Sequence, residues 1–138
     1  MHLTIVCDVQ YNAINDPTIQ KGRHTMKDDE QLQSLVIDLR RGTLVLAVLS
    51  CLKEKKYGYS LLQDMEEQGI RIEANTLYPL LRRLETQGLL ISEWDTGESR
   101  PRKYYILSKR GTKLQGLLKE EWRRLSQEME KFLEEEKS

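Results

Sequence analysis

The chain of 138 residues lacks an apolar run long enough to cross a lipid bilayer. Its most apolar stretch, LVLAVLSCL (44–52), has less than half of the ~20 residues that a spanning helix needs, so we expect a buried helix there. The N-terminus, MHLTIVCDVQ, has no basic lead, and Asp8 interrupts its short apolar run, which is not typical of a signal peptide. We therefore expect a cytoplasmic protein with no membrane partner.

Cysteine and histidine are scarce. The two cysteines, Cys7 and Cys51, lie in unrelated contexts, so a disulfide framework is not expected. Both histidines, His2 and His24, fall in the first 25 residues, and no serine, cysteine or carboxylate has an obvious activating partner. The sequence also lacks the closely paired ligands of a tetrahedral metal site. We expect neither an enzyme nor a metal or cofactor site.

The net charge is zero, with 22 basic and 22 acidic residues, which argues against a protein that simply coats nucleic acid. The distribution is uneven. Residues 71–113 hold nine basic and five acidic residues, a net of +4, whereas residues 114–138 hold five and seven, a net of −2. The middle of the chain can therefore present a local basic patch to an anion.

The N-terminal part of the chain predicts two consecutive helices. Residues 1–25 show no sustained periodicity, and we expect residues 1–27 to be an N-terminal extension that is disordered or results from a start assigned too far upstream. The segment DDEQLQSLVIDLRRG, which begins at Asp28, has acidic residues in its first turn and apolar residues at helical spacing. This pattern predicts a helix with a break near Gly42. The buried helix over 44–52 follows, and KEKK (53–56) is expected to be a solvated connector.

The middle of the chain predicts two further short helices. YGYSLLQDMEEQG predicts a helix that stops at Gly69, a residue suited to a helix C-cap. EANTLYPLLRRLETQGLL (73–90) has one leucine face and closes at Gly88. Asn75 or Thr76 can serve as its N-cap, and with Thr76 as the cap Pro79 is the third helical residue, in the first turn, where a missing N–H costs nothing. The residues of the leucine face are Leu77, Leu80, Leu81 and Leu84.

The last third of the chain predicts a β-hairpin and a long helix. LLISEW (89–94) and RKYYIL (102–107) are β-prone runs, and the intervening DTGESRP suits a turn. A helix is then expected from about Ser108 to Lys137. Its apolar residues are spaced like the a and d positions of a coiled coil over about two heptads. This seam consists of Leu118, Trp122, Leu125, Met129 and Phe132.

This order of elements predicts a mainly α protein with a small β-hairpin, namely a winged helix-turn-helix domain over 28–107 and a C-terminal dimerisation helix over 108–138. The helix within 73–90, about three turns long, has a length that fits a DNA major groove. Arginine forks suit guanine edges and phosphates, while basic residues of the hairpin would contact the neighbouring backbone. The candidate DNA-binding residues are Tyr57, Tyr59, Asn75, Thr76, Tyr78, Arg82, Arg83, Arg100, Arg102 and Lys103, with Pro79 flanking them.

Simpler interpretations exist for some of these residues. An Arg-Arg pair such as Arg82–Arg83 is, in isolation, more often a solvated surface than a DNA contact. Tyr57 and Tyr59 could serve as packing at a helix start. The hairpin arginines together with the arginine-bearing helix favour the DNA interpretation, because two separate elements carry the same charge sign.

The segments LRRGTLVLAVLSCL, YGYSLLQDM, NTLYPLLRRLETQGLL and RPRKYYILSKRG resemble the PadR family of transcriptional regulators, in particular its short members with one C-terminal helix. The resemblance covers about residues 34–134. It implies a three-helix core, a two-stranded wing, a C-terminal helix that contacts a partner subunit, and repression by promoter occlusion. By this resemblance Asn75 to Arg82 lie in the recognition helix and Arg100 to Tyr104 in the wing.

A homodimer is expected, since the apolar seam would stay wet on a lone domain. A two-fold dimer presents two recognition helices to adjacent major grooves, so double-stranded DNA with a pseudo-palindromic operator is the expected partner. Trp122 is either interface packing or, by the resemblance, the residue that stacks flat aromatic effectors between subunits. The candidate ligand-binding residues are Trp122, Leu118, Leu125, Leu35 and Leu39. The alternative function is a winged-helix protein–protein interaction module without DNA binding.

Overall fold

The computed structural model describes residues 25–97 and 100–135, so the predictions for residues 1–24, including Cys7, His2 and His24, lie outside the described residues. Two helices at the start of this part, α3 (Met26–Arg41) and α4 (Leu44–Cys51), are separated at Gly42 and Thr43, which confirms the predicted break. The helix α3 begins two residues before the predicted start. Thr25 and Asp28 form a reciprocal capping box at that end, with each backbone N–H bound by the other's side chain.

The helices α5 (Gly58–Glu67) and α6 (Ala74–Thr86) form the helix-turn-helix pair. Both end at a glycine with positive φ, Gly69 at 87° and Gly88 at 79°, as predicted. The residue after each glycine donates back to the helix, from Ile70 N–H to Met65 at 2.8 Å and from Leu89 N–H to Leu84 at 2.9 Å.

The predicted start of α6 was wrong. Neither Asn75 nor Thr76 caps this helix, because the backbone carbonyl of Glu73 already accepts from Thr76 at 3.0 Å and from Leu77 at 2.9 Å. Pro79 is therefore an interior residue and cannot donate to the carbonyl of Asn75. The helix persists because each buried leucine of its inner face contributes roughly 1.5–3 kcal/mol, and two of them outweigh the ~3 kcal/mol cost of the proline.

The sheet has three antiparallel strands in the order β1-β3-β2. The predicted hairpin is present as β2 (Leu90–Asp95) and β3 (Arg102–Leu107), with Asp95 opposite Arg102 at the tip. The third strand, β1 (Lys56–Tyr57), was not predicted, since Lys56 was assigned to a solvated connector. It pairs Tyr57 with Tyr104 of β3, and a strand of two residues is too short to show an alternating pattern.

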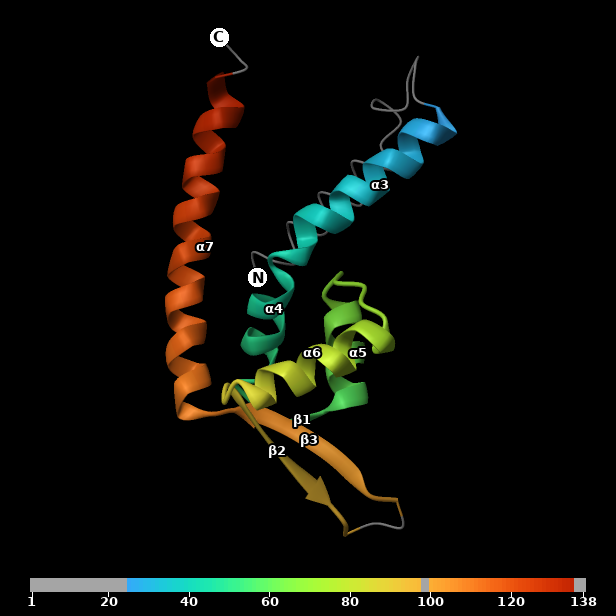
Figure 1. Ribbon diagram of the computed structural model, residues 1–138, viewed down its shortest axis with the longest axis vertical. Helices are drawn as coiled ribbons and strands as arrows, with labels where there is room; N and C mark the ends of the chain where they lie inside the picture. Colours follow the sequence, from blue (N-terminus) through green and yellow to red (C-terminus); the bar gives the residue numbers. More distant parts are fainter. Residues whose placement is uncertain (1–24, 98–99, 136–138) are drawn as a thin grey trace.

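The last helix, α7 (Lys109–Glu135), starts where the sequence predicted. Ser108 caps it by accepting from Gly111 N–H at 2.9 Å, and the predicted end at Lys137 lies outside the described residues. Figure 1 shows α3 and α7 projecting from the same end of the molecule and diverging, with the β2–β3 hairpin at the opposite end.

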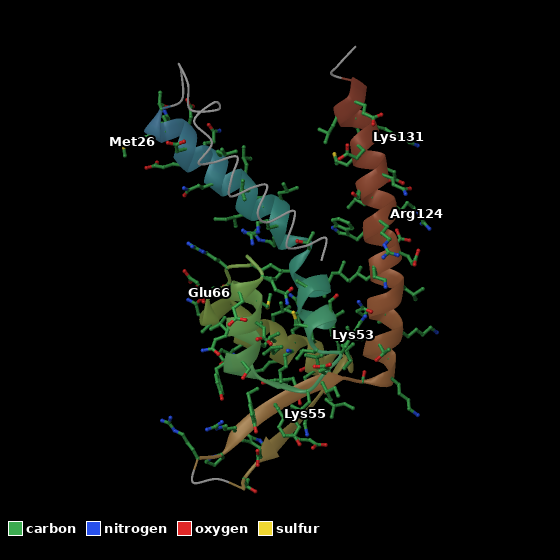
Figure 2. All side chains as sticks on the ribbon, turned by 180° about the vertical axis from the view of Figure 1, so that it is seen from behind. Met26, Lys53, Lys55, Glu66, Arg124 and Lys131 are labelled. Carbon is green, nitrogen blue, oxygen red and sulfur yellow. The ribbon has the colours of Figure 1, made fainter. Side chains whose placement is uncertain are left out.

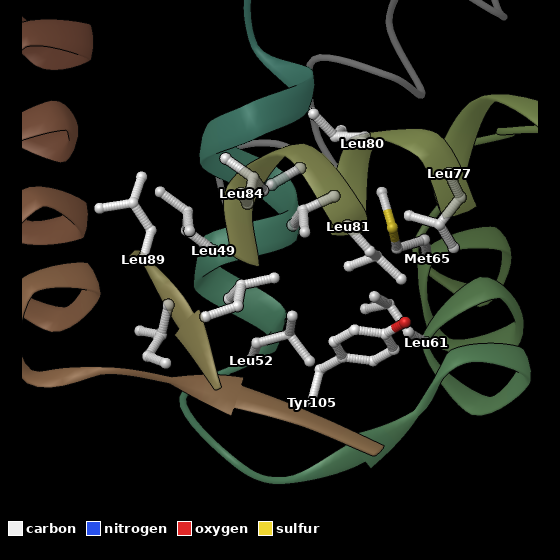
Figure 3. Close-up of a cluster of buried hydrophobic side chains, with 14 of the residues drawn as sticks. Leu49, Leu52, Leu61, Met65, Leu77, Leu80, Leu81, Leu84, Leu89 and Tyr105 are labelled. Carbon is white, nitrogen blue, oxygen red and sulfur yellow. The ribbon is translucent and has the colours of Figure 1, made fainter. Parts of the chain in front are cut away.

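The core lies between α4, α5, α6 and the sheet (Figure 3). Its centre is almost entirely leucine from the three helices, closed on the sheet side by Tyr105, which is 4% exposed. All four leucines of the predicted α6 face are buried. No helix in the described residues is long and apolar enough to span a bilayer. The fully buried leucines are Leu49, Leu52, Leu61, Leu77, Leu81 and Leu84.

Candidate nucleic-acid interface

The helix α6 has an open face directly opposite its buried leucines. Successive residues turn by about 100° around a helix, which places four exposed residues on the side farthest from the core. Arg83 and Thr76 flank this open face on one edge, and Tyr78 flanks it on the other. The four residues of the open face are Asn75, Pro79, Arg82 and Thr86.

Arg82 and Arg83 are unlike three exposed arginines of the other helices, each of which pairs with a carboxylate three residues earlier in the chain. These pairs are Arg41–Asp38 at 3.4 Å, Arg123–Glu120 at 3.9 Å and Arg124–Glu121 at 2.8 Å. Within residues 25–97 and 100–135, the guanidinium groups of Arg82 and Arg83 form no hydrogen bond or ion pair. Their charge is uncompensated locally, and an anion approaching α6 meets both.

Glu85 could neutralise Arg82 from one turn away, but it is held elsewhere. Its carboxylate accepts from the hydroxyl of Ser92 on β2 and from the ammonium of Lys103 on β3 at 3.5 Å. Glu85 thus ties the last turn of α6 to the wing, and it draws Lys103 to the side of the sheet that faces α6.

Tyr78 locks α6 against the start of α5. A Cβ placed on Gly58 would lie 2.6 Å from the Tyr78 ring, so only glycine allows this close approach. Gly58 stands between Tyr57 and Tyr59, and this contact makes the flank of α6 continuous with those two tyrosines.

A cluster of Tyr57, Tyr59 and Arg102 joins α5 to the wing. The two tyrosine rings are stacked with centroids 6.0 Å apart and planes within 4° of parallel. The guanidinium of Arg102 lies 5.5 Å from the Tyr57 ring and 5.8 Å from the Tyr59 ring, and it donates to the Tyr59 hydroxyl at 3.2 Å. This arrangement collects a cation and a hydroxyl at one exposed point.

The outer face of the sheet adjoins the cluster of Tyr57, Tyr59 and Arg102. Tyr104 meets Tyr57 edge-on, with centroids 5.9 Å apart, and donates its hydroxyl to Glu93 at 2.8 Å. The ammonium of Lys55 lies 4.3 Å from the centre of the Tyr104 ring, near the base of the wing in Figure 2. The basic surface therefore extends from α6 across the start of α5 to the wing.

Comparison with known proteins identifies the family to which this fold belongs. The sequence profile described as the transcriptional regulator PadR-like family matches residues 45–120, which cover α4, the helix-turn-helix pair, the wing and the start of α7. The chain belongs to the PadR-like family of transcriptional regulators.

Solved structures of family members cover most of the chain. A PadR family transcriptional regulator from Eggerthella lenta DSM 2243 is 50% identical and has a TM-score of 0.76, over 79% of this chain and 97% of that one. A PadR family regulator from Clostridium difficile R20291 is 30% identical with a TM-score of 0.62, over 67% and 99%. The transcriptional regulator Rv3488 of Mycobacterium tuberculosis is 43% identical over 49 residues, which span 36% of this chain and less than half (46%) of that protein.

The structure brings most of the predicted DNA-binding residues of this PadR-like protein to one surface. Asn75 and Arg82 lie on the open face of α6. Thr76, Tyr78 and Arg83 flank it, and Tyr57, Tyr59 and Arg102 form the adjoining cluster. Arg100 is exposed beside the wing tip. Lys103 is set apart, because Glu85 holds it between the wing and α6.

Four residues of this surface were missed by sequence reasoning. Gly58 admits the Tyr78 ring, Glu85 anchors the wing, Asp95 accepts from the Tyr57 hydroxyl at 2.7 Å, and Lys55 covers Tyr104. Only Gly58 carried a local signal, a glycine between two tyrosines. The other three act through partners on separate elements.

The predicted ligand-binding and dimer residues lie at a second place, a groove of about 480 Å³ between α7 and the α3–α4 junction. Leu39 from α3 and Leu46 from α4 face α7 across this groove. On α7 it is lined by Leu118, Trp122, Leu125 and Met129, among others. Leu35 and Phe132 were predicted to join this apolar surface, and the single described chain leaves both exposed outside the groove, at 58% and 67%.

Cys51 is the cysteine that lies within the described residues. Cys51 is half-buried between the core and Lys56, and burial raises the pKa of its thiol. Within residues 25–97 and 100–135, no group of three or more histidine, cysteine, aspartate or glutamate residues is placed to hold a metal ion.

Proposed function

We propose that this PadR-like regulator is a homodimer that binds double-stranded operator DNA, with α6 in the major groove and the wing on the adjacent backbone. The observation that carries the proposal is that two arginines of α6 have no carboxylate partner among the described residues. Arg82 and Arg83 lack the carboxylate partners that Arg41, Arg123 and Arg124 have, and they lie on one surface with Arg102. The positive charge of Arg82 and Arg83, which no carboxylate of the described residues pairs with, suits a phosphate or a guanine edge.

The dimer is proposed from the apolar surface that the single chain leaves exposed. The helix α3 has no buried residue, and its Leu39 is 64% exposed. On the outer half of α7, Leu125 and Phe132 are 56% and 67% exposed. Figure 2 shows α3 extending from the core toward Met26 and the outer half of α7 extending toward Lys131. Packing against a second copy would bury both faces, and its two-fold axis would set half-sites roughly 10 bp apart.

The groove between α7 and the α3–α4 junction is the proposed effector site. Its lining includes Trp122, whose ring can stack on a flat aromatic ligand. The charged residues of the lining are three glutamates and two arginines, and one arginine, Arg124, pairs with Glu121, so the remaining excess of negative charge favours a cation. A ligand held between the subunits would release DNA if it favoured a dimer in which the two α6 helices are spaced wrongly for adjacent grooves.

The test begins with footprinting by the purified protein, starting at the promoter next to its own gene. A fluorescein-labelled duplex of the footprinted segment then reports affinity by anisotropy across a salt series. We expect log K to fall steeply with log[salt], because each neutralised phosphate adds about 0.9 to the slope.

Matched charge reversals locate the surface. Arg82→Glu is expected to weaken binding by at least about tenfold, while Arg123→Glu, on a paired arginine of α7, leaves affinity within about twofold. If Arg82→Glu and Arg102→Glu both fold and bind like the wild type, the protein–protein interaction module becomes the better function. A gel-filtration mass of one chain at micromolar concentration would contradict the dimer.

A further inference from the structure

Asp95, at the end of β2, is an acidic residue inside the basic surface just described. Its carboxylate accepts from the hydroxyl of Tyr57 at 2.7 Å and from the backbone N–H of Gly97 at 3.1 Å. These two hydrogen bonds, the tyrosine's first, hold the pKa of Asp95 below its ordinary value, so the group stays charged. A fixed negative charge near DNA phosphates weakens binding by electrostatic repulsion, so the presence of Asp95 here calls for a compensating role.

The purpose is visible in what Asp95 does to Tyr57. Because Tyr57 donates its hydroxyl proton to Asp95, its ring has a fixed direction. Tyr59 stacks on one side of that ring, nearly parallel, while Tyr104 meets it edge-on at 73°. Asp95 and Tyr57 are 38 residues apart, so this hydrogen bond ties the wing to the start of α5.

The ordered tyrosines in turn place two donors side by side. Arg102 extends over both rings and donates to the Tyr59 hydroxyl at 3.2 Å. A hydroxyl that accepts one hydrogen bond still has its own proton to donate, and a guanidinium carries five N–H groups in a fork. Tyr59 is 48% exposed, so its hydroxyl and the guanidinium can reach two oxygens of the same anion.

We propose that Tyr59 and Arg102 form one binding site for a single backbone phosphate of the operator, and that Asp95 positions this site through Tyr57. The inference rests on the proposed DNA binding. The anion is a DNA phosphate because Tyr78, packed on Gly58, makes this point continuous with the open face of α6. Asp95 positions the site through its hydrogen bond to Tyr57, and its charge also lies close to Arg102, the residue opposite it on β3.

Charge and position make opposite predictions for Asp95→Ala. Removing a negative charge near phosphates should tighten DNA binding by simple electrostatics. If Asp95 positions the phosphate site, the same change weakens binding by about tenfold, the equivalent of one hydrogen bond to a charged group. The salt slope also becomes shallower by about 0.9, because one phosphate contact is lost.

Three further variants separate the positioning role from a loss of folding. Asp95→Asn keeps an acceptor oxygen for Tyr57 and is expected to restore binding to within about twofold of the wild type. Tyr57→Phe removes the donor and keeps the ring, so it should weaken binding as Asp95→Ala does. Because both changes break the same hydrogen bond, Tyr57→Phe combined with Asp95→Ala should bind no more weakly than either single variant.

Glu93→Ala is the matched control, since Glu93 lies two residues away on the same face of β2 and bonds Tyr104 instead. It should bind DNA as tightly as the wild type or slightly more tightly. All variants are assayed as full-length protein on the footprinted duplex, with circular dichroism to verify folding.

The inference is overturned if Asp95→Ala binds as tightly as the wild type, if Asp95→Asn fails to restore binding, or if the double variant loses the sum of the two single effects. These results would leave DNA binding itself intact. A wild-type protein with no salt-dependent affinity for the duplex would instead refute the proposed function, and the phosphate site with it.

Discussion

Gly111, the third residue of α7, is the position where a single methyl group should have the clearest effect. A Cβ added there would lie 2.0 Å from the carbonyl oxygen of Leu89 and 3.2 Å from a methyl group of Leu107. The carbonyl cannot easily move away, because it accepts from Ser108 N–H at 3.0 Å, and the Ser108 hydroxyl binds Gly88. Gly111→Ala must therefore displace the start of α7 from the turn after α6.

The magnitude follows from three terms. Alanine is favoured over glycine inside a helix by about 1 kcal/mol. Overpacking of this kind costs about 1–3 kcal/mol, and a weakened Ser108–Leu89 hydrogen bond costs about 1 kcal/mol more. We expect Gly111→Ala to lower the free energy of unfolding by about 1–3 kcal/mol.

Gly116→Ala is the matched control on the same helix. No atom lies within 4 Å of a Cβ at Gly116, and this residue faces away from Leu118 and the proposed dimer seam. Only the helix preference remains, so the free energy of unfolding should rise by about 0.5–1 kcal/mol. The two substitutions are chemically identical and are expected to have opposite signs.

Urea unfolding followed by circular dichroism measures both variants. The protein concentration must be the same throughout, because dimerisation makes apparent stability depend on concentration. A Gly111→Ala protein at least as stable as the wild type would refute the close approach of α7 to Leu89. Loss of DNA affinity in folded Gly111→Ala would further show that the position of α7 affects the DNA-binding surface of α6 and the wing.

Three other predictions concern α6, the wing and the groove. Pro79→Ala provides a backbone N–H that can donate to the Asn75 carbonyl and should stabilise the protein by about 1–2 kcal/mol in urea unfolding; a loss of stability would argue against an interior proline. By NMR, the carboxyl pKa of Asp95 should lie below 3.8 and rise in Tyr57→Phe. Since folding lowers this pKa, its contribution to stability is complete above about pH 5 and is lost as the pH falls through the folded value; an unshifted midpoint would exclude the Tyr57 bond. In a Trp94→Phe background, planar aromatic cations should quench Trp122 fluorescence, and no quenching across a broad panel would leave packing as its role.

Features set by neighbouring residues could be predicted. The leucine spacing of α6 defined its buried face, and Gly69 and Gly88 marked two helix ends, because helix periodicity and capping depend only on residues within about five positions. The hairpin strands and the start of α7 at Ser108 followed in the same way.

Predictions from the local sequence pattern were wrong where a backbone group had two possible hydrogen-bond partners. Asn75 and Thr76 are good N-caps by residue type, yet Glu73 begins α6 through its carbonyl alone. Lys56 was assigned to a solvated connector by composition, but it pairs with Tyr105 of β3. Here tertiary packing outweighs the preference of the short segment.

The sequence by itself determined the helices, the hairpin, their order and the family to which they belong, since these depend on periodicity and short motifs, whereas the strand β1 emerged only in the structure. The tertiary structure alone decided how the charges are used. It turned Glu85 toward Lys103 and left Arg82 without a carboxylate, and it brought Asp95 to Tyr57 across 38 residues. The reason is physical: a side chain's partner is set by where the fold places other elements, and no spacing along the chain encodes that distance.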